Sequence, residues 1–267
     1  MRAATSLVPL LQAARASGIP NLWRGDEWIV DDWRPDCIPT GFAALDCELP
    51  GRGWPNGQLV ELLIDHPGIG ELGLLLPALA AVTRTGRSCV WVLPCQQSPA
   101  EAATALPYAP ALLEAGIDLA RNVFVRPLTP RESGWALEQS LRTAHLGALL
   151  GWLPASTSAD AEFRSLRRLH LLAQKHRALV FILRETHHAR SPSPAALRLQ
   201  LHHDSDQLQV QVLKRRGRPL LEPIALQVHP AQWSERMAPT PSSLPWRQSR
   251  AYPPTTPRKS GALWAPA

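Results

Sequence analysis

Residues 57–72 read GQLVELLIDHPGIGEL and contain the clearest indication of the fold in this sequence. This stretch begins with Gly57, which permits a tight turn, and continues into an aliphatic run typical of a buried strand. A short loop containing Gly68 and Gly70 follows, and the pattern from Glu71 to Thr85 is helical. The stretch therefore predicts a strand, a tight loop and a helix in succession, which is the repeating unit of a parallel sheet.

The same alternation of short aliphatic runs and longer helical patterns continues through the middle of the chain. The predicted strands are Gln58–Ile64, Ser88–Leu93, Asn122–Arg126, Leu146–Leu153 and Ala178–Leu183. The predicted helices are Glu71–Thr85, Pro99–Ala115, Arg131–Ala144 (with Leu137, Leu141 and Ala144 on its apolar face) and Ala159–Arg177. This alternation predicts an α/β fold in which helices flank a mostly parallel β-sheet on both faces.

The pattern changes after a Pro/Ser break at residues 190–194. Apolar residues then alternate with glutamines, at Leu208, Val210 and Val212. This period of two predicts a half-buried antiparallel strand, and Gly217 and Pro219 supply a turn into a partner strand at Leu220–Val228. We therefore expect Ala178–Leu183 to be the last parallel strand and a C-terminal antiparallel hairpin to close the domain.

Length and composition favour one globular domain with extensions. The chain has 267 residues, of which 45% are hydrophobic and 19% charged. We expect an N-terminal segment at residues 1–36, a domain at 37–230 and a disordered, basic, proline-rich tail at 231–267. The formal net charge of +6, carried largely by arginine, is compatible with an acidic partner.

Several functional classes find no support in the sequence. The four cysteines have neither CxxC nor metal-ligand spacing, and the N-terminus lacks a signal pattern, which predicts a cytoplasmic protein with reduced thiols. The longest apolar run, Leu72–Val82, is too short to cross a bilayer, so we expect no membrane role. Histidine pairs at 187–188 and 202–203 lack accompanying ligands, and we interpret them as parts of polar loops rather than a metal site.

The segment before the first strand resembles the lead-in to the nucleotide loop of the RecA recombinase family. Thr40-Gly41, Leu45-Asp46 and the Pro-Asn-Gly-Gln-Leu-Val-Glu run at residues 55–61 stand at the spacings of that family's elements. The resemblance implies a RecA-like core.

A working phosphate loop would next read Gly-x-x-x-x-Gly-Lys-Ser/Thr, where the lysine neutralises phosphate oxygens and the hydroxyl ligates Mg²⁺. The chain keeps Gly70 but has Glu71 in the lysine position, Leu72 in the hydroxyl position and Asp65 in place of the first glycine. The resemblance also places Cys95 where the water-activating acid would be. Trp152 falls where a magnesium-associated aspartate would sit. The sequence therefore predicts no ATPase activity and no cofactor.

With the Leu-Trp-Arg-Gly element at residues 22–25 and the basic tail, the degenerate core resembles the ImuA family, formerly grouped as SulA-like. This resemblance implies an adaptor role in SOS-induced translesion synthesis, in the cytoplasm at the nucleoid. The implied partners are a Y-family polymerase homologue, an error-prone replicative-type polymerase, RecA and DNA, together with self-association.

Two groups of basic residues and two tail tryptophans are the candidate contacts with DNA or a partner. One face of the helix at 159–177 carries Arg164, Arg167, Arg168 and Lys175. The hairpin carries Lys214, Arg215 and Arg216, in a segment that resembles the basic turn at a RecA subunit interface. Trp246 and Trp264 are candidate tail contacts. For both basic groups the alternative is a solvated charged surface.

Two other functions stay open at this point. One is a RecA-like ATPase in which a displaced cation, Arg84 or Arg87, reaches the nucleotide loop. The other is a cell-division inhibitor, which the older SulA-like grouping indicates.

Overall fold

The computed structural model describes residues 36–95, 106–154, 158–204 and 206–228. The chain divides into two units, Met1–His229 and Pro230–Ala267, and all the described residues belong to the first. The Leu-Trp-Arg-Gly element at 22–25 and the tail tryptophans Trp246 and Trp264 lie outside the described residues.

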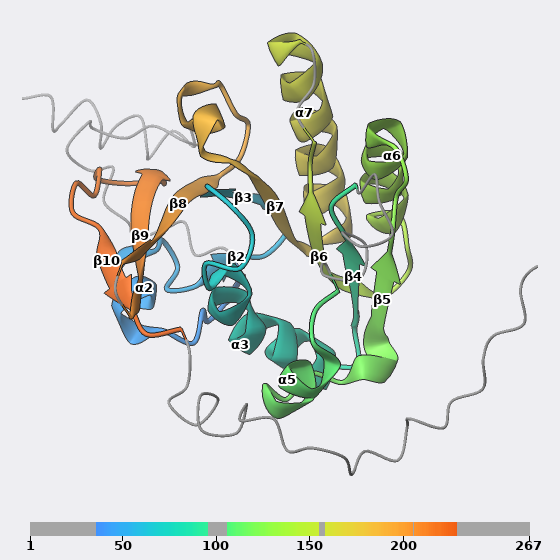
Figure 1. Ribbon diagram of the computed structural model, residues 1–267, viewed down its shortest axis with the longest axis horizontal. Helices are drawn as coiled ribbons and strands as arrows, with labels where there is room; N and C mark the ends of the chain where they lie inside the picture. Colours follow the sequence, from blue (N-terminus) through green and yellow to red (C-terminus); the bar gives the residue numbers. More distant parts are fainter. Residues whose placement is uncertain (1–35, 96–105, 155–157, 205, 229–267) are drawn as a thin grey trace, which may run out of the picture. The chain divides into compact units, whose positions relative to one another are not determined.

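An eight-stranded mixed sheet is the framework of the described domain (Figure 1). Its strand order is β10-β9-β8-β3-β7-β6-β4-β5. The bounds are β3 Leu59–Ile64, β4 Ser88–Val92, β5 Asn122–Val125, β6 Leu146–Trp152, β7 Leu179–Glu185, β8 Leu197–Asp204, β9 Gln207–Lys214 and β10 Ile224–Leu226. Neighbouring strands from β8 through to β5 are parallel, whereas β9 and β10 are antiparallel. The predicted α/β class, with a mostly parallel sheet and a terminal antiparallel hairpin, is confirmed.

Helices cover both faces of this sheet (Figure 1). Helix α3, Glu71–Arg84, packs against β4 and β6 on one face, while α6, Pro130–Ser140, and α7, Ala159–His176, lie together on the other. The shorter helical elements are α2 Ala43–Glu48, α5 Ala109–Glu114, η1 Leu119–Arg121 and η2 Thr186–Arg190. The predicted helices that became α3 and α7 agree with the structure to within one residue. Of the predicted helix at 99–115, residues 99–105 lie outside the described part.

Strand β3 lies inside the sheet, between β8 and β7, and connects the two edges of the sheet at which its ends lie. All six of its residues are buried, because it has parallel neighbours on both sides and helices on both faces. This double coverage explains why its sequence is almost continuously aliphatic. The loop at residues 65–70 leaves its carboxyl end, and Gln58 marks its amino end.

The segment before β3 is a tightly bonded turn. A small antiparallel pair, β1 Cys37–Ile38 and β2 Trp54–Pro55, encloses α2. The Asp46 carboxylate accepts the backbone N–H of Thr40 at 2.9 Å, and Leu45 is fully buried. Gly41 has φ 91°, and a Cβ at that position would come within 2.5 Å of Pro77 in α3. The Thr-Gly and Leu-Asp elements therefore fix how this turn packs on the helix that follows the loop.

The prediction that Ala178–Leu183 is the last parallel strand is wrong. Strand β8 follows it and pairs in parallel with β3, between β3 and the hairpin. Its sequence alternates leucine with Arg198, Gln200 and His202, a half-buried pattern that the sequence reading missed. As a result His202 and His203 lie in a strand, not in a polar loop. The partner strand of the hairpin is also shorter than predicted, because β10 covers only Ile224–Leu226.

The predicted helix at Arg131–Ala144 ends early. Helix α6 stops at Ser140, and a turn that includes His145, with φ 60°, leads into β6. Leu137 and Leu141 are buried as predicted, whereas Ala144 is exposed in the turn. A left-handed residue cannot continue a helix, so the apolar stripe ends one turn sooner than its spacing indicated.

Candidate functional site

The loop after β3 holds its own anion. Helix α3 begins at Glu71, directly after Gly70, which has φ 107°. The Glu71 side chain folds back over the loop, and its two carboxylate oxygens accept the backbone N–H of Gly68 at 2.9 and 3.1 Å. Only 3% of Glu71 is exposed. In a phosphate-binding loop, N–H groups of this kind point at the phosphate. Here a carboxylate of the chain takes that place.

This arrangement disfavours the binding of a triphosphate for two reasons. Two like unit charges about 4 Å apart repel by roughly 4 kcal/mol at an effective dielectric near 20. The next residue, Leu72, is half-buried and offers no oxygen for Mg²⁺. The loop region therefore lacks both the cation and the metal ligand that phosphate chemistry requires.

The Asp65 side chain contacts residues in β8 and just after β7, not residues of its own loop. Its Oδ1 accepts the hydroxyl of Thr186, after β7, at 2.5 Å, and its Oδ2 lies 3.4 Å from Nδ1 of His202 in β8. The hydrogen bond from Thr186, followed by the charge of His202, lowers the pKa of Asp65. The carboxyl ends of β3, β7 and β8 are thus joined by polar contacts at Asp65, the position that the sequence analysis aligned with the first glycine of a phosphate loop.

The other two positions predicted to have lost their catalytic residues lie at the same edge of the sheet. Cys95 follows β4, and Trp152 is the last residue of β6, the strand beside β4. Both are half-buried. Neither side chain carries an oxygen that could organise a magnesium–water cluster.

The displaced cations considered in the sequence analysis do not reach the loop. Arg84 ends α3, which is 14 residues long, and this places it about 20 Å from Gly70. Arg87 points elsewhere, since its Nη2 donates to the carbonyls of Leu146 at 2.5 Å and Arg177 at 3.1 Å. The interpretation that either arginine replaces the lost lysine is wrong.

A buried ionic cluster, which the sequence reading missed, lies beneath α7 on the sheet. Its members are Glu61, Glu162, Arg184, His188 and Arg198. Glu61 in β3 is fully buried and binds both arginines, Arg184 Nη1 at 2.7 Å and Arg198 Nε at 2.7 Å. Register explains the contacts, because Arg198 stands opposite Glu61 in β8 and Arg184 lies diagonally across in β7.

Glu162 on α7 and His188 in η2 complete the ionic network. Glu162 Oε2 lies 2.5 Å from Arg184 Nη2 and 3.3 Å from His188 Nδ1. Arg198 also donates to the backbone carbonyls of η2, including that of His188 at 2.8 Å. Burial, and then the charge of Arg184, lower the pKa of His188. The cluster therefore connects β3, β7, β8, α7 and η2. In the sequence, it could have been recognised from charged residues that stand within otherwise apolar strands.

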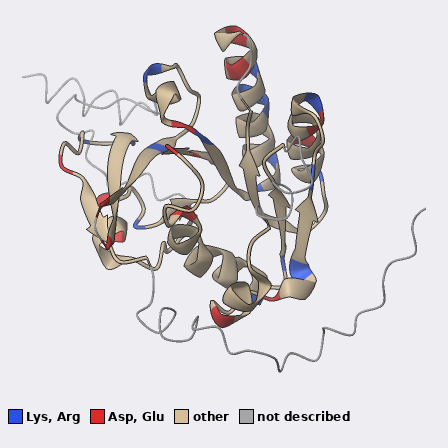
Figure 2. Cartoon of the chain, in the orientation of Figure 1, with Lys and Arg blue, Asp and Glu red and all other residues tan. Residues whose placement is uncertain are grey.

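The basic face predicted for α7 is present at the surface. Arg164, Arg167, Arg168 and Lys175 are all exposed, and charges of both signs lie along the helix in Figure 2. Arg168 is paired, because its Nε lies 2.7 Å from Oε1 of Glu138 in α6. Exposed pairs of this kind contribute little to stability.

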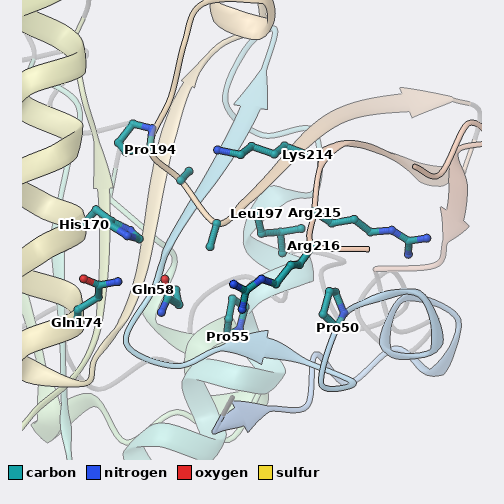
Figure 3. Close-up of a pocket in the computed structure, with 12 residues that line it drawn as sticks. Pro50, Pro55, Gln58, His170, Gln174, Pro194, Leu197, Lys214, Arg215 and Arg216 are labelled. Carbon is teal, nitrogen blue, oxygen red and sulfur yellow. The ribbon is translucent and has the colours of Figure 1, made fainter. Parts of the chain in front are cut away.

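The second predicted basic group, Lys214 to Arg216, lines a groove of about 410 Å³ (Figure 3). The groove lies at the amino ends of β3 and β8, opposite the loop at 65–70. Its lining residues are Pro50, Pro55, Gln58, His170, Gln174, Pro194, Ala195, Ala196, Leu197, Lys214, Arg215 and Arg216. Of the two basic groups, only the hairpin lines the groove. The α7 residues that join it, His170 and Gln174, were not predicted.

Other chemistries find little support in the described part of the chain. No cluster of three or more His, Cys, Asp or Glu side chains there could hold a metal ion. Burial raises the pKa of Cys37 to about 11 and that of Cys89 to about 12, which disfavours a reactive thiolate at either position. Among the described helices, none combines the length and apolar character needed to cross a membrane.

Comparison with known proteins finds similarity to a cell division inhibitor. The chain is 27% identical over 129 residues to the cell division inhibitor SulA of Yersinia pestis strain Pestoides F and, equally, to that of Yersinia pseudotuberculosis serotype O:1b strain IP 31758. The matched region covers 48% of this chain and 68% of each relative. No family model matches. The chain is thus similar to SulA over about half its length, in line with the grouping named in the sequence analysis.

Proposed function

We propose that this protein is a non-catalytic, RecA-like adaptor of the SOS response that serves translesion synthesis. The observation that carries the proposal is the Glu71 carboxylate bound to the Gly68 N–H. A chain that fills its phosphate loop with its own anion is suited to present a fold, not to turn over ATP. The preserved lead-in at Thr40–Asp46 supports descent from a nucleotide-binding ancestor.

The proposed partners are a Y-family polymerase homologue, an error-prone replicative-type polymerase and RecA. Two exposed surfaces support contact with acidic partners or DNA: the outer face of α7 and the hairpin at Lys214–Arg216. The tail at 231–267 and self-association remain part of the proposal. The proposed location is the cytoplasm, at the nucleoid.

Co-purification tests the adaptor role. The full chain, and the chain lacking residues 231–267, would each be expressed with each of the three proposed partners in turn: the Y-family polymerase homologue, the replicative-type polymerase and RecA. We expect the full chain to co-purify without added nucleotide, since no turnover is involved. Failure of the full chain to co-purify with any of the three proposed partners would contradict the proposal. If the chain without the tail still bound the partner, a role of the tail in that contact would be excluded, and the adaptor proposal would stand.

A second candidate function is inhibition of cell division, and the similarity to SulA favours it. The two functions predict different phenotypes in a bacterium exposed to DNA damage. An adaptor should change the frequency of induced mutations when it is deleted, with normal cell length on overexpression. Filamentation on overexpression, with no change in mutation frequency on deletion, would favour the inhibitor and contradict the adaptor.

A further inference from the structure

The groove at the amino edge of the sheet is lined by positively charged side chains. Its lining includes Lys214, the last residue of β9, and Arg215 and Arg216, which follow it, and none of its described lining residues is an aspartate or glutamate. The carboxylate of Glu48, in α2, binds Arg215 at 3.0 Å. On the α7 wall, burial and then the charges of Arg167 and Lys214 lower the pKa of His170. The described lining therefore carries cationic side chains, and such a surface favours an anionic partner.

The cationic wall is held in place by the protein itself. Arg215 is only 12% exposed, and it binds the backbone and side chain of Glu48 and the carbonyl of Arg218. Lys214 Nζ donates to the carbonyl of Ser193 at 2.9 Å. In Figure 3 Arg215 points away from the groove, whereas Arg216 extends across it toward Gln58. Side chains that are already positioned lose less conformational freedom when a partner binds.

The remaining lining identifies the class of partner. Surfaces that bind single-stranded nucleic acid combine cations with aromatic side chains on which bases stack. Among the described lining residues, the only aromatic side chain is the imidazole of His170, and the apolar part of that lining, here called the floor, consists of prolines, alanines and Leu197. Gln58 and Gln174 add amide groups that can bond to a peptide backbone. Its volume lies within the range of specific binding pockets, which is about 300–1,000 Å³.

We propose that this groove binds an extended acidic segment of a partner protein, with carboxylates at Lys214 and Arg216 and apolar side chains on the proline-rich floor. The inference rests on the proposed adaptor function and names the chemistry of one partner contact. Nucleic acid is the competing occupant, and the experiment below distinguishes the two.

The test measures fluorescence anisotropy with the full chain and three labelled probes. One is a short peptide that alternates acidic pairs with leucine and proline, the second is the same peptide with Asn and Gln replacing Asp and Glu, and the third is an oligothymidylate of matched length. We expect only the acidic peptide to bind saturably. The double variant Lys214→Glu/Arg216→Glu should weaken this binding by about tenfold to hundredfold.

Two controls keep the result interpretable. Arg131→Glu/Arg142→Glu makes the same change in net charge at exposed residues outside the groove and should leave binding within about twofold of the wild type. Lys214→Gln/Arg216→Gln removes the charges without reversing them and should give an intermediate loss, with an unfolding curve like that of the wild type. Equal losses in the groove and control variants, or no binding of the acidic peptide, would overturn the inference.

Other outcomes separate this inference from the proposed function. Binding of the oligothymidylate with loss in the same groove variant would replace the acidic segment with nucleic acid. If the groove variant still co-purified with the polymerase homologue at the wild-type level, the groove inference would fail while the adaptor proposal stood. If the wild type bound the acidic peptide but co-purified with no proposed partner, the adaptor proposal would fail instead.

Discussion

The loop at residues 65–72 and the basic groove lie at opposite edges of one sheet, joined by β3, and they treat anions in opposite ways. At the carboxyl edge, Glu71 supplies a carboxylate to the Gly68 N–H, so the anion is part of the chain. At the amino edge, cations line an open groove whose described lining includes no carboxylate, while Glu48 beside it binds Arg215. A resemblance to a nucleotide loop therefore does not by itself identify an anion site, because the charges around the backbone N–H groups decide whether an external anion has a place to bind.

The largest effect is expected from a change in β3, the strand that connects the two edges. Glu61 lies in the middle of β3 and neutralises two buried arginines. We expect Glu61→Gln to lower the free energy of unfolding by about 3–5 kcal/mol, because a buried charge loses its partner. Urea unfolding followed by circular dichroism measures the loss. The matched change Glu138→Gln, which breaks the exposed pair with Arg168, should cost under about 1 kcal/mol. Similar losses in both variants would contradict the role assigned to the cluster.

The second prediction concerns the anion within the loop. Glu71→Ala should destabilise the protein by about 1.5–3 kcal/mol, the range for a hydrogen bond to a charged group. The amide resonance of Gly68 should shift in the same variant, because its N–H loses the carboxylate acceptor. Glu71→Gln retains an acceptor oxygen and should show smaller changes in both measurements. An unchanged Gly68 resonance in Glu71→Ala would show that the carboxylate is not bound there.

The third prediction tests the backbone that brings Glu71 over the loop. Gly70 has φ 107°, so Gly70→Ala should cost about 1–2 kcal/mol in unfolding free energy. Gly134, inside α6, has nothing within 4 Å of an added Cβ, and Gly134→Ala should instead stabilise by about 0.5–1 kcal/mol. Thermal or urea unfolding of the two variants checks the opposite signs. Stabilisation by Gly70→Ala would contradict the loop conformation.

The smallest effect expected is a dependence of stability on pH through His188. Its pKa is lower in the folded protein than the ordinary 6.5, so the unfolded chain binds the proton more readily. The stability contributed by neutral His188 is therefore present above about pH 6.5 and is lost as pH falls through the folded pKa. Unfolding free energies between pH 8 and pH 5 should decline less in His188→Asn than in the wild type. Parallel curves would exclude His188 as the source.

Sequence reasoning predicted the architecture better than the sites because apolar period and turn chemistry are local signals. The strand, loop and helix from Gln58 to Thr85 follow directly from such signals. Strand β8 was missed although its leucines alternate with Arg198, Gln200 and His202, because the polar residues dominated the reading. Its parallel pairing with β3 depends on residues more than a hundred positions away, which no local pattern reports.

The loop, the ionic cluster and the groove were likewise only partly predictable from local sequence patterns. The charge reversal at Glu71 was visible in the sequence, but its bond to Gly68 requires the left-handed turn at Gly70 to bring the carboxylate back. The cluster around Glu61 depends on register between three strands, and only its buried charges could have signalled it. The groove joins Lys214–Arg216 to His170 and Gln174 of α7, which a helical-face argument had not selected.

The most direct test of the central claim is titration calorimetry of magnesium-ATP into two proteins side by side, the wild type and Glu71→Lys/Leu72→Thr. Removing a repulsion of roughly 4 kcal/mol corresponds to about a thousandfold in affinity. We predict no saturable binding to the wild type and measurable binding to the double variant, whose loop has regained a cation and a hydroxyl. Saturable, magnesium-dependent binding to the wild type that Gly70→Ala abolishes would contradict the claim that Glu71 fills this site.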